Sequence, residues 1–514
     1  MPPSINASAP SRTKAFICNV FWSFALQVAT LAVGFLVPRA IIACYGSEVN
    51  GLVVSLTQFV TYISLVEAGI SSAAIFALYK PLAENDLNRV SVIVSAARKF
   101  YYASGWIFVA LIACLAFFYP LLVDSGEMNR YQVFVLVLSL GSMGFMDFFT
   151  LAKYRVLLTA SQRNWVVQIG SIIYKILYAV IVIVLAYQKY PIELVYVAAI
   201  APIVLRSVVL SIYTRSKFPS VSFNADARSY KLEQRWDAFV LQVLGVVQSG
   251  FPILVATFIT EDLALVSVFS VYLLVATGLQ NLYSVMTNGT QAAFGDVIAR
   301  NDTQTLKKTY SEMGTLVGLV NSAASGTAII MITPFVFLYT SDIADINYVM
   351  PVLGILMVAN VFLYHLKTPE GLLVVAGGKY RESRPYVMIQ TIVLIVGATV
   401  GGFLGGLEGI VIGSCLSNVY AALYLLFFVP ARITKTKVRS TLRKFAVTIV
   451  AFAPSVLVAS TQFVQIRSWG AWIGVCAIVA GASMAYSMGV FMLLERSSTR
   501  ALIQRIFKAI KAKA

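Results

Sequence analysis

The segment AFICNVFWSFALQVATLAVGFLV, residues 15–37, carries no charged side chain. Roughly 20 consecutive apolar residues let a helix cross the hydrocarbon core of a bilayer. This run is longer than the apolar part of a secretory signal peptide, and no small-residue cleavage site follows it, so we expect a retained first helix. Comparable runs recur almost to Glu495. The sequence therefore predicts a polytopic membrane protein.

The composition of the whole chain supports this class. Of its 514 residues, 59% are hydrophobic and only 12% are charged, and the mean hydropathy is +0.82. Breaks that contain charged residues, glycine or proline divide the chain into about fourteen spans. The spans begin near Ala15, Leu52, Phe100, Tyr131, Trp165, Ile192, Asp237, Asp262, Met313, Ile346, Pro385, Glu408, Lys444 and Trp469.

The distribution of basic residues predicts the orientation. Of the 39 Lys and Arg residues, 32 lie in the two tails and in the connections after even-numbered spans. Basic residues accumulate on the cytoplasmic side of a membrane. We therefore expect both termini to be cytoplasmic and the protein to lie in the plasma (inner) membrane. This topology, with attraction to anionic lipid, also explains the net charge of +17 without a nucleic-acid partner.

The chain resembles itself at an offset of 215 to 216 residues. FALQV at 24–28 recurs as FVLQV at 239–243, and LAEND at 82–86 recurs as IARND at 298–302. The offset spans six helices, an even number of crossings, so the two copies have the same orientation, as in the parallel repeats of some secondary transporters. The predicted fold class is an all-α polytopic membrane protein of about 14 transmembrane helices, in two pseudo-symmetric six-helix lobes plus a C-terminal helix pair.

The expected organisation follows from this repeat. Helices 1–6 form an N-lobe in residues 1–220, helices 7–12 form a C-lobe in residues 221–432, and helices 13–14 occupy residues 433–495. The tail RALIQRIFKAIKAKA, within residues 496–514, gathers its apolar side chains on one helical face. That pattern favours a basic amphipathic helix lying on the inner leaflet, with a solvated basic tail as the alternative.

Sites of enzyme chemistry are not evident in the sequence. It has one histidine, His365, and no GxxxxGK[ST] phosphate loop, and its five cysteines are scattered. We therefore expect no enzyme activity, no cofactor and no metal site. Uphill transport would have to draw on an ion gradient, with H⁺ or Na⁺ as the coupling ion, or on the gradient of the substrate.

Two ionisable residues lie deep within predicted spans. Glu67 interrupts QFVTYISLVEAGISSAAIF at 58–76, and Lys175 lies near the middle of span five. A central charge costs at least about 2.5–3.5 kcal/mol, so such a group usually faces a wet cavity or a charged partner. The alternative for these two residues is a mutual ion pair that only holds helices together.

The remaining charges within spans are less unusual. Arg39, Asp147 and Arg206 lie near enough to a span end to reach toward water. Lys367 lies with His365 and Glu370 in YHLKTPEG, where the Pro and Gly indicate either a broken helix or a simple helix end. A single histidine in such a place is more often a packing residue than a ligand.

The segment NGLVVSLTQFVTYISLVEAGISSAAIFALYKPLAENDLNRV, residues 50–90, resembles the second-helix region of Wzx-type polysaccharide flippases of the multidrug/oligosaccharidyl-lipid/polysaccharide superfamily. Glu67, Ala68 and Gly69 match the family's acid and glycine, while Ile70 replaces a leucine. LLTASQRNW at 157–165 is similar to a cytoplasmic connection of the family. The resemblance implies movement of an undecaprenyl-pyrophosphate-linked oligosaccharide from the inner to the outer leaflet for surface polysaccharide assembly. It further implies alternating access, a cationic cavity and coupling to an ion gradient.

This resemblance suggests roles for particular residues. Cations would bind the pyrophosphate, carboxylates would bind the coupling ion, and amides and tyrosines would contact the sugars. The expected partners are the lipid-linked oligosaccharide and membrane lipids, with a polysaccharide polymerase and glycosyltransferases as associated proteins. The candidates are Arg39, Lys175, Arg206 and Lys367 for the head group, Glu67 and Asp147 for ion coupling, and Gln27, Gln58, Tyr62, Gln242, Gln248 and Tyr272 for sugar contacts.

Three alternative functions are compatible with the sequence. A cation-coupled multidrug exporter of the same superfamily would favour a cavity rich in carboxylates. The charged residues within the predicted spans here are instead four basic residues and three acidic ones, Glu67, Asp147 and Glu370. A peptidoglycan-precursor flippase would also have fourteen spans. A membrane scaffold that transports nothing has no need of Glu67 or Lys175 at mid-bilayer.

Overall fold

A computed structural model describes residues 12–67, 70–123, 128–227, 235–300, 302–461 and 466–511. These residues form helices and short connections, without a strand among them. Twelve of the helices are long and apolar enough to cross a membrane. The predicted all-α polytopic membrane fold is confirmed.

Glycines divide two of these twelve helices into two legs each. In α1 (Arg12–Ile63) the division is at Gly46, with φ +85°, and in α14 (Tyr380–Val429) it is at Gly405 and Gly406, the latter with φ +57°. Positive φ is accessible to glycine without strain because it has no Cβ. With the legs counted separately, the twelve helices comprise fourteen helical segments, which equals the predicted number of spans.

The two legs of α14 pack backbone against backbone. A Cβ at Gly401 would overlap the carbonyl of Gly409, and one at Gly413 would overlap the backbone of Gly397. Small residues at four-residue spacing let membrane helices approach this closely. A side chain at Gly401, Gly409 or Gly413 would collide with the backbone of the other leg, so these glycines are required for the close packing of the hairpin.

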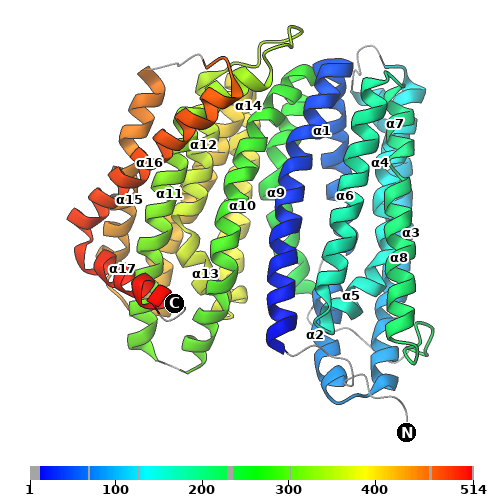
Figure 1. Ribbon diagram of the computed structural model, residues 1–514, viewed down its shortest axis with the longest axis horizontal. Helices are drawn as coiled ribbons and strands as arrows, with labels where there is room; N and C mark the ends of the chain where they lie inside the picture. Colours follow the sequence, from blue (N-terminus) through cyan, green and yellow to red (C-terminus); the bar gives the residue numbers. More distant parts are fainter. Residues whose placement is uncertain are drawn as a thin grey trace. The chain divides into compact units, whose positions relative to one another are not determined.

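The first of two compact units comprises the chain up to Gly250 together with Glu261–Ser267. In it α6 (Asn164–Tyr187) contacts α1, α5, α7 and α8 (Figure 1). The unit's remaining elements are η2 (Ser64–Glu67), α2 (Ile70–Ala83), α3 (Leu87–Leu122), α4 (Arg130–Met146), η3 (Asp147–Leu151), α5 (Ala152–Ala160), α7 (Ile192–Ala198), α8 (Ala201–Lys217) and most of α9 (Arg235–Thr260).

The second unit comprises Phe251–Thr260 and Val268–Ala514. Its most buried helix is α11 (Thr303–Tyr339), which contacts α12, α13, α15, α16 and α17 (Figure 1). The C-terminal helix pair, α15 and α16, therefore packs on a helix of the second repeat. The other elements are α10 (Leu263–Ala299), α12 (Pro351–Leu366), α13 (Thr368–Ala376), α14, η4 (Pro430–Thr434), α15 (Val438–Thr461), α16 (Trp469–Leu494) and α17 (Arg496–Lys511).

Helix boundaries repeat along the chain as the sequence predicted. The short helix α5 begins at Ala152 and α13 begins at Thr368, 216 residues later. The same interval separates the N-caps of α3 and α11, where Asp86 and Asp302 each accept a hydrogen bond from the backbone N–H three residues on. Such caps satisfy backbone donors at the helix start. The internal repeat thus extends to its capping residues.

The predicted amphipathic tail forms the helix α17, which contacts α11 and α16. Side chains beyond Gln504 in this helix lie outside the described residues, and so do Ala68 and Gly69, which follow Glu67. The position of α17 on the inner leaflet stays a prediction.

The orientation of the chain gives a direct prediction. Reporter domains fused after Lys189 and after Ser468 should be external, and those after Ser216, Arg439 and Ala514 should be cytoplasmic, because basic residues gather in the latter connections. Enzymatic or accessibility reporters in intact cells measure this. A C-terminal fusion that reads as external would contradict the predicted orientation.

Candidate functional site

An ion-paired triad lies within the first unit. Nη1 of Arg155, on α5, donates to Oδ2 of Asp147 at 2.9 Å, and Nη2 donates to Oε1 of Glu67 at 3.1 Å. All three side chains are partly buried. The planar guanidinium suits this bridging because it presents several donors in a fixed fork. Glu67 is therefore paired with Arg155 rather than with Lys175.

Both carboxylates of the triad lie where a helix departs from α geometry. Glu67 ends the 3₁₀ turn η2, and Asp147 begins the π-helical segment η3. Two α-helical turns cover about seven residues, so the wider π turn takes up the extra residue that separates Asp147 from Arg155. The two side chains then share a helix face. Mid-helix 3₁₀ and π segments are frequent at functional sites and hinges.

One oxygen of the triad lacks a partner. Oε2 of Glu67 is buried and has no hydrogen bond among the described residues. Two carboxylates share the single positive charge of Arg155, which leaves one negative charge to balance locally. A proton or a sodium ion on the free oxygen would supply that balance.

Lys175 lies on the inward face of α6. The buried residues of this helix include Gln168, Ala179 and Val182, and Lys175 follows at the same helical spacing. The opposite face carries exposed apolar side chains such as Ile173 and Ile176. Among the described residues, the half-buried Lys175 ammonium makes no hydrogen bond and no ion pair. A deep cation in this position has no anion to neutralise it.

Arg206, on α8, adds a second cation beside Lys175. The two are close enough for their charges to repel. The guanidinium lies 5.8 Å from the centre of the Tyr174 ring, and Gly170 leaves room for its aliphatic stem. Its Nε is buried without an acceptor among the described residues, although Asp147 attracts it at longer range. The side of the cluster formed by α6 and α8 is therefore positively charged. The Lys175 ammonium and the Nε of Arg206 are hydrogen-bond donors without an acceptor among the described residues.

The other candidates of the first unit lie on α1 and α9. Arg39 and Gln27 are half-buried on α1, and the Tyr62 hydroxyl donates to the carbonyl of Val247 at 3.4 Å. Gln58 packs its amide against the backbone of Gly250 on α9. Two further glutamines follow on α9: Gln242 is exposed and Gln248 is half-buried.

The second unit holds Lys367 in a polar network. α12 ends at Leu366 and α13 begins at Thr368, so YHLKTPEG is a broken helix. The buried Lys367 ammonium donates to Oδ1 of Asn418 at 3.0 Å and lies 4.9 Å from the Tyr364 ring. Unlike Lys175, this cation is already bound by its own unit.

Two other residues of the second unit, His365 and Tyr272, make packing contacts or hydrogen bonds within that unit. His365 lies against Tyr283, with ring centres 3.8 Å apart, and its Nδ1 is 3.2 Å from Oγ1 of Thr368. The Tyr272 hydroxyl is buried, donates to the carbonyl of Tyr348 and accepts from the N–H of Met350. The hydrogen bonds of Tyr272 hold the connection that leads into α12.

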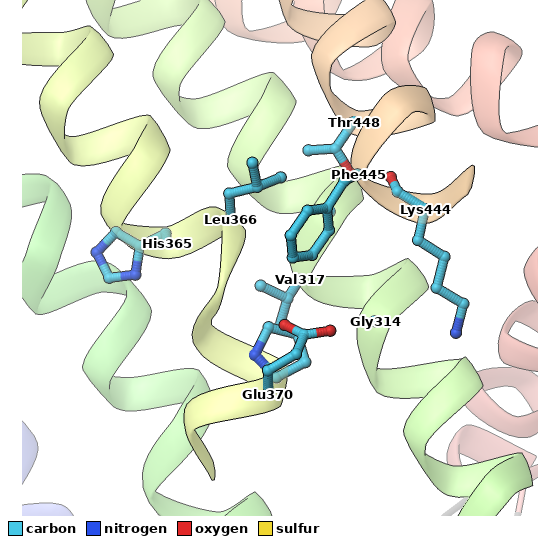
Figure 2. A pocket seen from close by; sticks show the side chains of 10 residues that line it. Gly314, Val317, His365, Leu366, Glu370, Lys444, Phe445 and Thr448 are labelled. Atoms are coloured by element: carbon cyan, nitrogen blue, oxygen red, sulfur yellow. Dashed lines mark hydrogen bonds between the residues drawn. The ribbon is translucent and has the colours of Figure 1, made fainter. Parts of the chain in front are cut away.

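Glu370 lines a small cavity between α11, α13 and α15 (Figure 2). Its side chain is only 2% exposed, and Oε1 accepts a 2.6 Å hydrogen bond from the Tyr310 hydroxyl. The Lys444 ammonium, from α15, enters the same region and donates to the carbonyl of Ser311 at 3.2 Å. The cavity has room for about one water molecule. This cluster joins the C-terminal helix pair to the second repeat.

The sequence analysis did not select Arg155, Tyr310, Lys444 or Asn418, which belong to these clusters. Arg155 lies close to a basic connection and thus has an ordinary topological role, and Tyr310 and Lys444 lie far along the chain from Glu370. One signal was available for Arg155. Its spacing of eight residues from Asp147 in DFFTLAKYR places both on the same broad face of a helix, and the π turn aligns them more closely.

Solved membrane transporters have a similar fold. The chain superposes on an inward-facing multidrug resistance MATE family transporter of the MOP superfamily with a TM-score of 0.66 and 13% identity, covering 80% of this chain and 98% of that one. It superposes on the lipid II flippase MurJ, in an inward closed conformation, with a TM-score of 0.67 and 13% identity, covering 93% and 99%. An outward-facing MATE family transporter gives a TM-score of 0.55 and 14% identity, covering 84% and 98%. No family model and no curated protein matches the sequence.

Proposed function

We propose that this protein is a flippase that moves an undecaprenyl-pyrophosphate-linked oligosaccharide from the inner to the outer leaflet, coupled to an ion gradient. The observation that carries the proposal is which charged groups of the first unit have a partner of opposite charge and which have none among the described residues. Glu67 and Asp147 are bound to Arg155, whereas Lys175 and the Nε of Arg206 have no acceptor among the described residues. The triad carries one net negative charge, and Lys175 and Arg206 together carry two positive charges, so one positive charge remains to be neutralised. An anionic substrate fits this site, and a cationic drug does not.

The chemistry of a pyrophosphate matches the two cations. Lys175 supplies a compact charge, and Arg206 supplies a planar fork that can bind two phosphate oxygens at once. The pyrophosphate would offset the cost of holding Lys175 at depth. Glutamine and tyrosine side chains of the same unit, such as Gln58 and Tyr62, would contact the sugars.

The structural likeness is compatible with a lipid-linked substrate. The superposition on the MurJ flippase covers 93% of this chain and 99% of that one.

Transport in proteoliposomes tests the proposal. The purified protein should move a fluorescent undecaprenyl-pyrophosphate-linked oligosaccharide across the bilayer, measured by loss of accessibility to a membrane-impermeant quencher. Lipid II and a cationic dye such as ethidium form the two comparison arms. Movement of the dye but not of either lipid would overturn the proposal in favour of a multidrug exporter. Movement of lipid II alone would assign the protein to the peptidoglycan precursor.

Replacing Glu67 by glutamine should abolish the response of flipping to an imposed ion gradient and leave substrate binding largely intact. Glutamine keeps the size of the side chain and an oxygen for Arg155, but it can neither take up a proton nor bind a cation by charge. Alternation between two states would normally couple such uptake to substrate movement. Flipping is measured with and without a pH or sodium gradient, and Asp147→Asn serves as the matched variant. A Glu67→Gln protein that responds to the gradient as the parent does would make Glu67 a structural residue.

A further inference from the structure

A second group of cations lies at a hollow beside the N-terminal half of α3, apart from the triad. The pocket has a volume of about 490 Å³ and is lined by Ser95, Arg98, Lys99, Tyr102 and residues 223–226. Residues 100–122 of the same helix contain no charged side chain. Arg98 and Lys99 are therefore the last charges before the apolar part of the helix. In a membrane protein this position lies at the level of the lipid head groups.

One wall of the pocket is a chain segment held in place by its backbone. Residues 218–227 follow α8, and Phe218, Val221 and Ala227 of this segment are buried. Oγ of Ser91 accepts from the N–H of Ser222 at 3.0 Å, and Oγ of Ser95 accepts from the N–H of Ala225 at 2.9 Å. The segment is therefore fastened along α3, and the pocket is preformed.

The cations of the pocket are arranged around one tyrosine. Arg98 donates to the carbonyl of Phe223 at 3.0 Å, and its guanidinium lies 4.9 Å from the centre of the Tyr102 ring. Lys153, on α5, donates to the Tyr102 hydroxyl at 3.3 Å. Lys99 is exposed. Arg98 and Lys99 therefore line the pocket together with one carboxylate, Asp226, and Lys153 adds a third positive charge next to Tyr102. A guanidinium has five donors, so Arg98 can bind an anion and keep its contact with Phe223.

An aromatic track leads from this pocket along the membrane-facing side of α3. The Tyr102 ring lies 5.3 Å from that of Phe149, and Phe149 lies 5.5 Å from Trp106. Trp106 is 65% exposed, and its neighbour Ile107 is 53% exposed, within the uncharged part of the helix. Aromatic rings at this depth give an acyl chain an apolar surface next to a charged head group.

We propose that this pocket binds the phosphate of an anionic membrane lipid, with Arg98, Lys99 and Lys153 at the head group and Trp106 against an acyl chain. The site is separate from Lys175 and Arg206 and does not depend on the proposed transport. The aromatic track distinguishes a lipid from free phosphate, because a soluble anion would make no use of it. Lys153 is two residues from Arg155, so an occupied pocket would adjoin α5, the helix that carries the cation of the triad.

Quenching of Trp106 tests the lipid site directly. The full-length protein is reconstituted in phosphatidylcholine bilayers that contain either brominated phosphatidylglycerol or brominated phosphatidylcholine. The contribution of Trp106 is the difference between the parent and Trp106→Phe. Stronger quenching by the brominated phosphatidylglycerol is expected. In Arg98→Gln/Lys99→Gln this preference should weaken by on the order of tenfold in apparent affinity. Lys307→Gln/Lys308→Gln, an exposed lysine pair on α11, is the matched control and should keep it.

A second variant and a soluble anion separate lipid binding from a structural role of Arg98 and from binding of free phosphate. Arg98 supports the wall at Phe223, so Lys99→Glu provides a second test; Lys99 is exposed and should tolerate the change without loss of protein. Equal quenching by the two brominated lipids in the parent would overturn the proposal, and so would an unchanged preference in both variants. Thermal stabilisation by inorganic pyrophosphate that needs Arg98 and Lys99, without any lipid preference, would replace the lipid by a free phosphate compound.

Discussion

Replacing Lys175 by methionine should lower flipping by roughly ten- to a hundredfold, because the substrate loses one charge-assisted contact at its phosphates. The same change should raise the melting temperature of the purified protein. Lys175 makes no hydrogen bond and no ion pair among the described residues, so its removal relieves the cost of a buried charge and opens no contact. Methionine keeps the length of the apolar stem. Flipping in proteoliposomes and thermal unfolding in detergent measure the two effects.

The combination of lower transport and higher stability distinguishes a binding role from a structural one. Lys189→Met is the matched control, because Lys189 follows the end of the same helix and is exposed; neither quantity should change. If Lys175→Met transported normally at the abundance of the parent, the cationic site would be disproved. A loss of stability would instead indicate that Lys175 holds the helices together.

Replacing Arg155 by leucine should destabilise the protein by about 3–5 kcal/mol, because it leaves two partly buried carboxylates without their shared cation. The protein should accumulate poorly and unfold at lower temperature. Arg155→Lys should be intermediate, since one ammonium cannot reproduce a fork that binds two carboxylates. Thermal unfolding and the amount of protein in the membrane fraction provide the measurements.

A triple substitution tests whether the unpaired carboxylates cause the loss of stability. Glu67→Gln and Asp147→Asn in the Arg155→Leu background remove the charges that were left without a partner, so stability should largely return while transport stays low. Interaction energies of this kind are expected only between residues in contact. An Arg155→Leu protein as stable as the parent would show that the triad contributes nothing to folding.

Much of the fold could be predicted from apolar runs and from the positions of charges between them. Each crossing must satisfy its own backbone hydrogen bonds, so a sufficiently long apolar run specifies a helix almost without regard to its neighbours. The division of α1 and α14 into two legs followed from breaks near Gly46 and Gly406. The repeat followed from weak matches at one offset and reappears in the paired N-caps Asp86 and Asp302.

The partners of the buried charges could not be predicted in the same way. Which cation binds Glu67 depends on the direction of each helix face, and the π turn at Asp147 shifts that direction by one residue. Glu370 and Tyr310 belong to helices that are distant along the chain, so only tertiary packing brings them together. The sequence indicated which charges lie within apolar segments, whereas it did not indicate which residues they contact.

The glycine contacts of α14 have a mechanical consequence. Because Gly397 and Gly401 touch Gly413 and Gly409 through backbone atoms, no side chain is left between the two legs that could change rotamer and let them slide. We therefore expect the two legs of the hairpin to move together as one rigid body. A rearrangement that moves this hairpin would then bend the chain at its two ends, near Lys379 and Pro430, where the helix begins and ends.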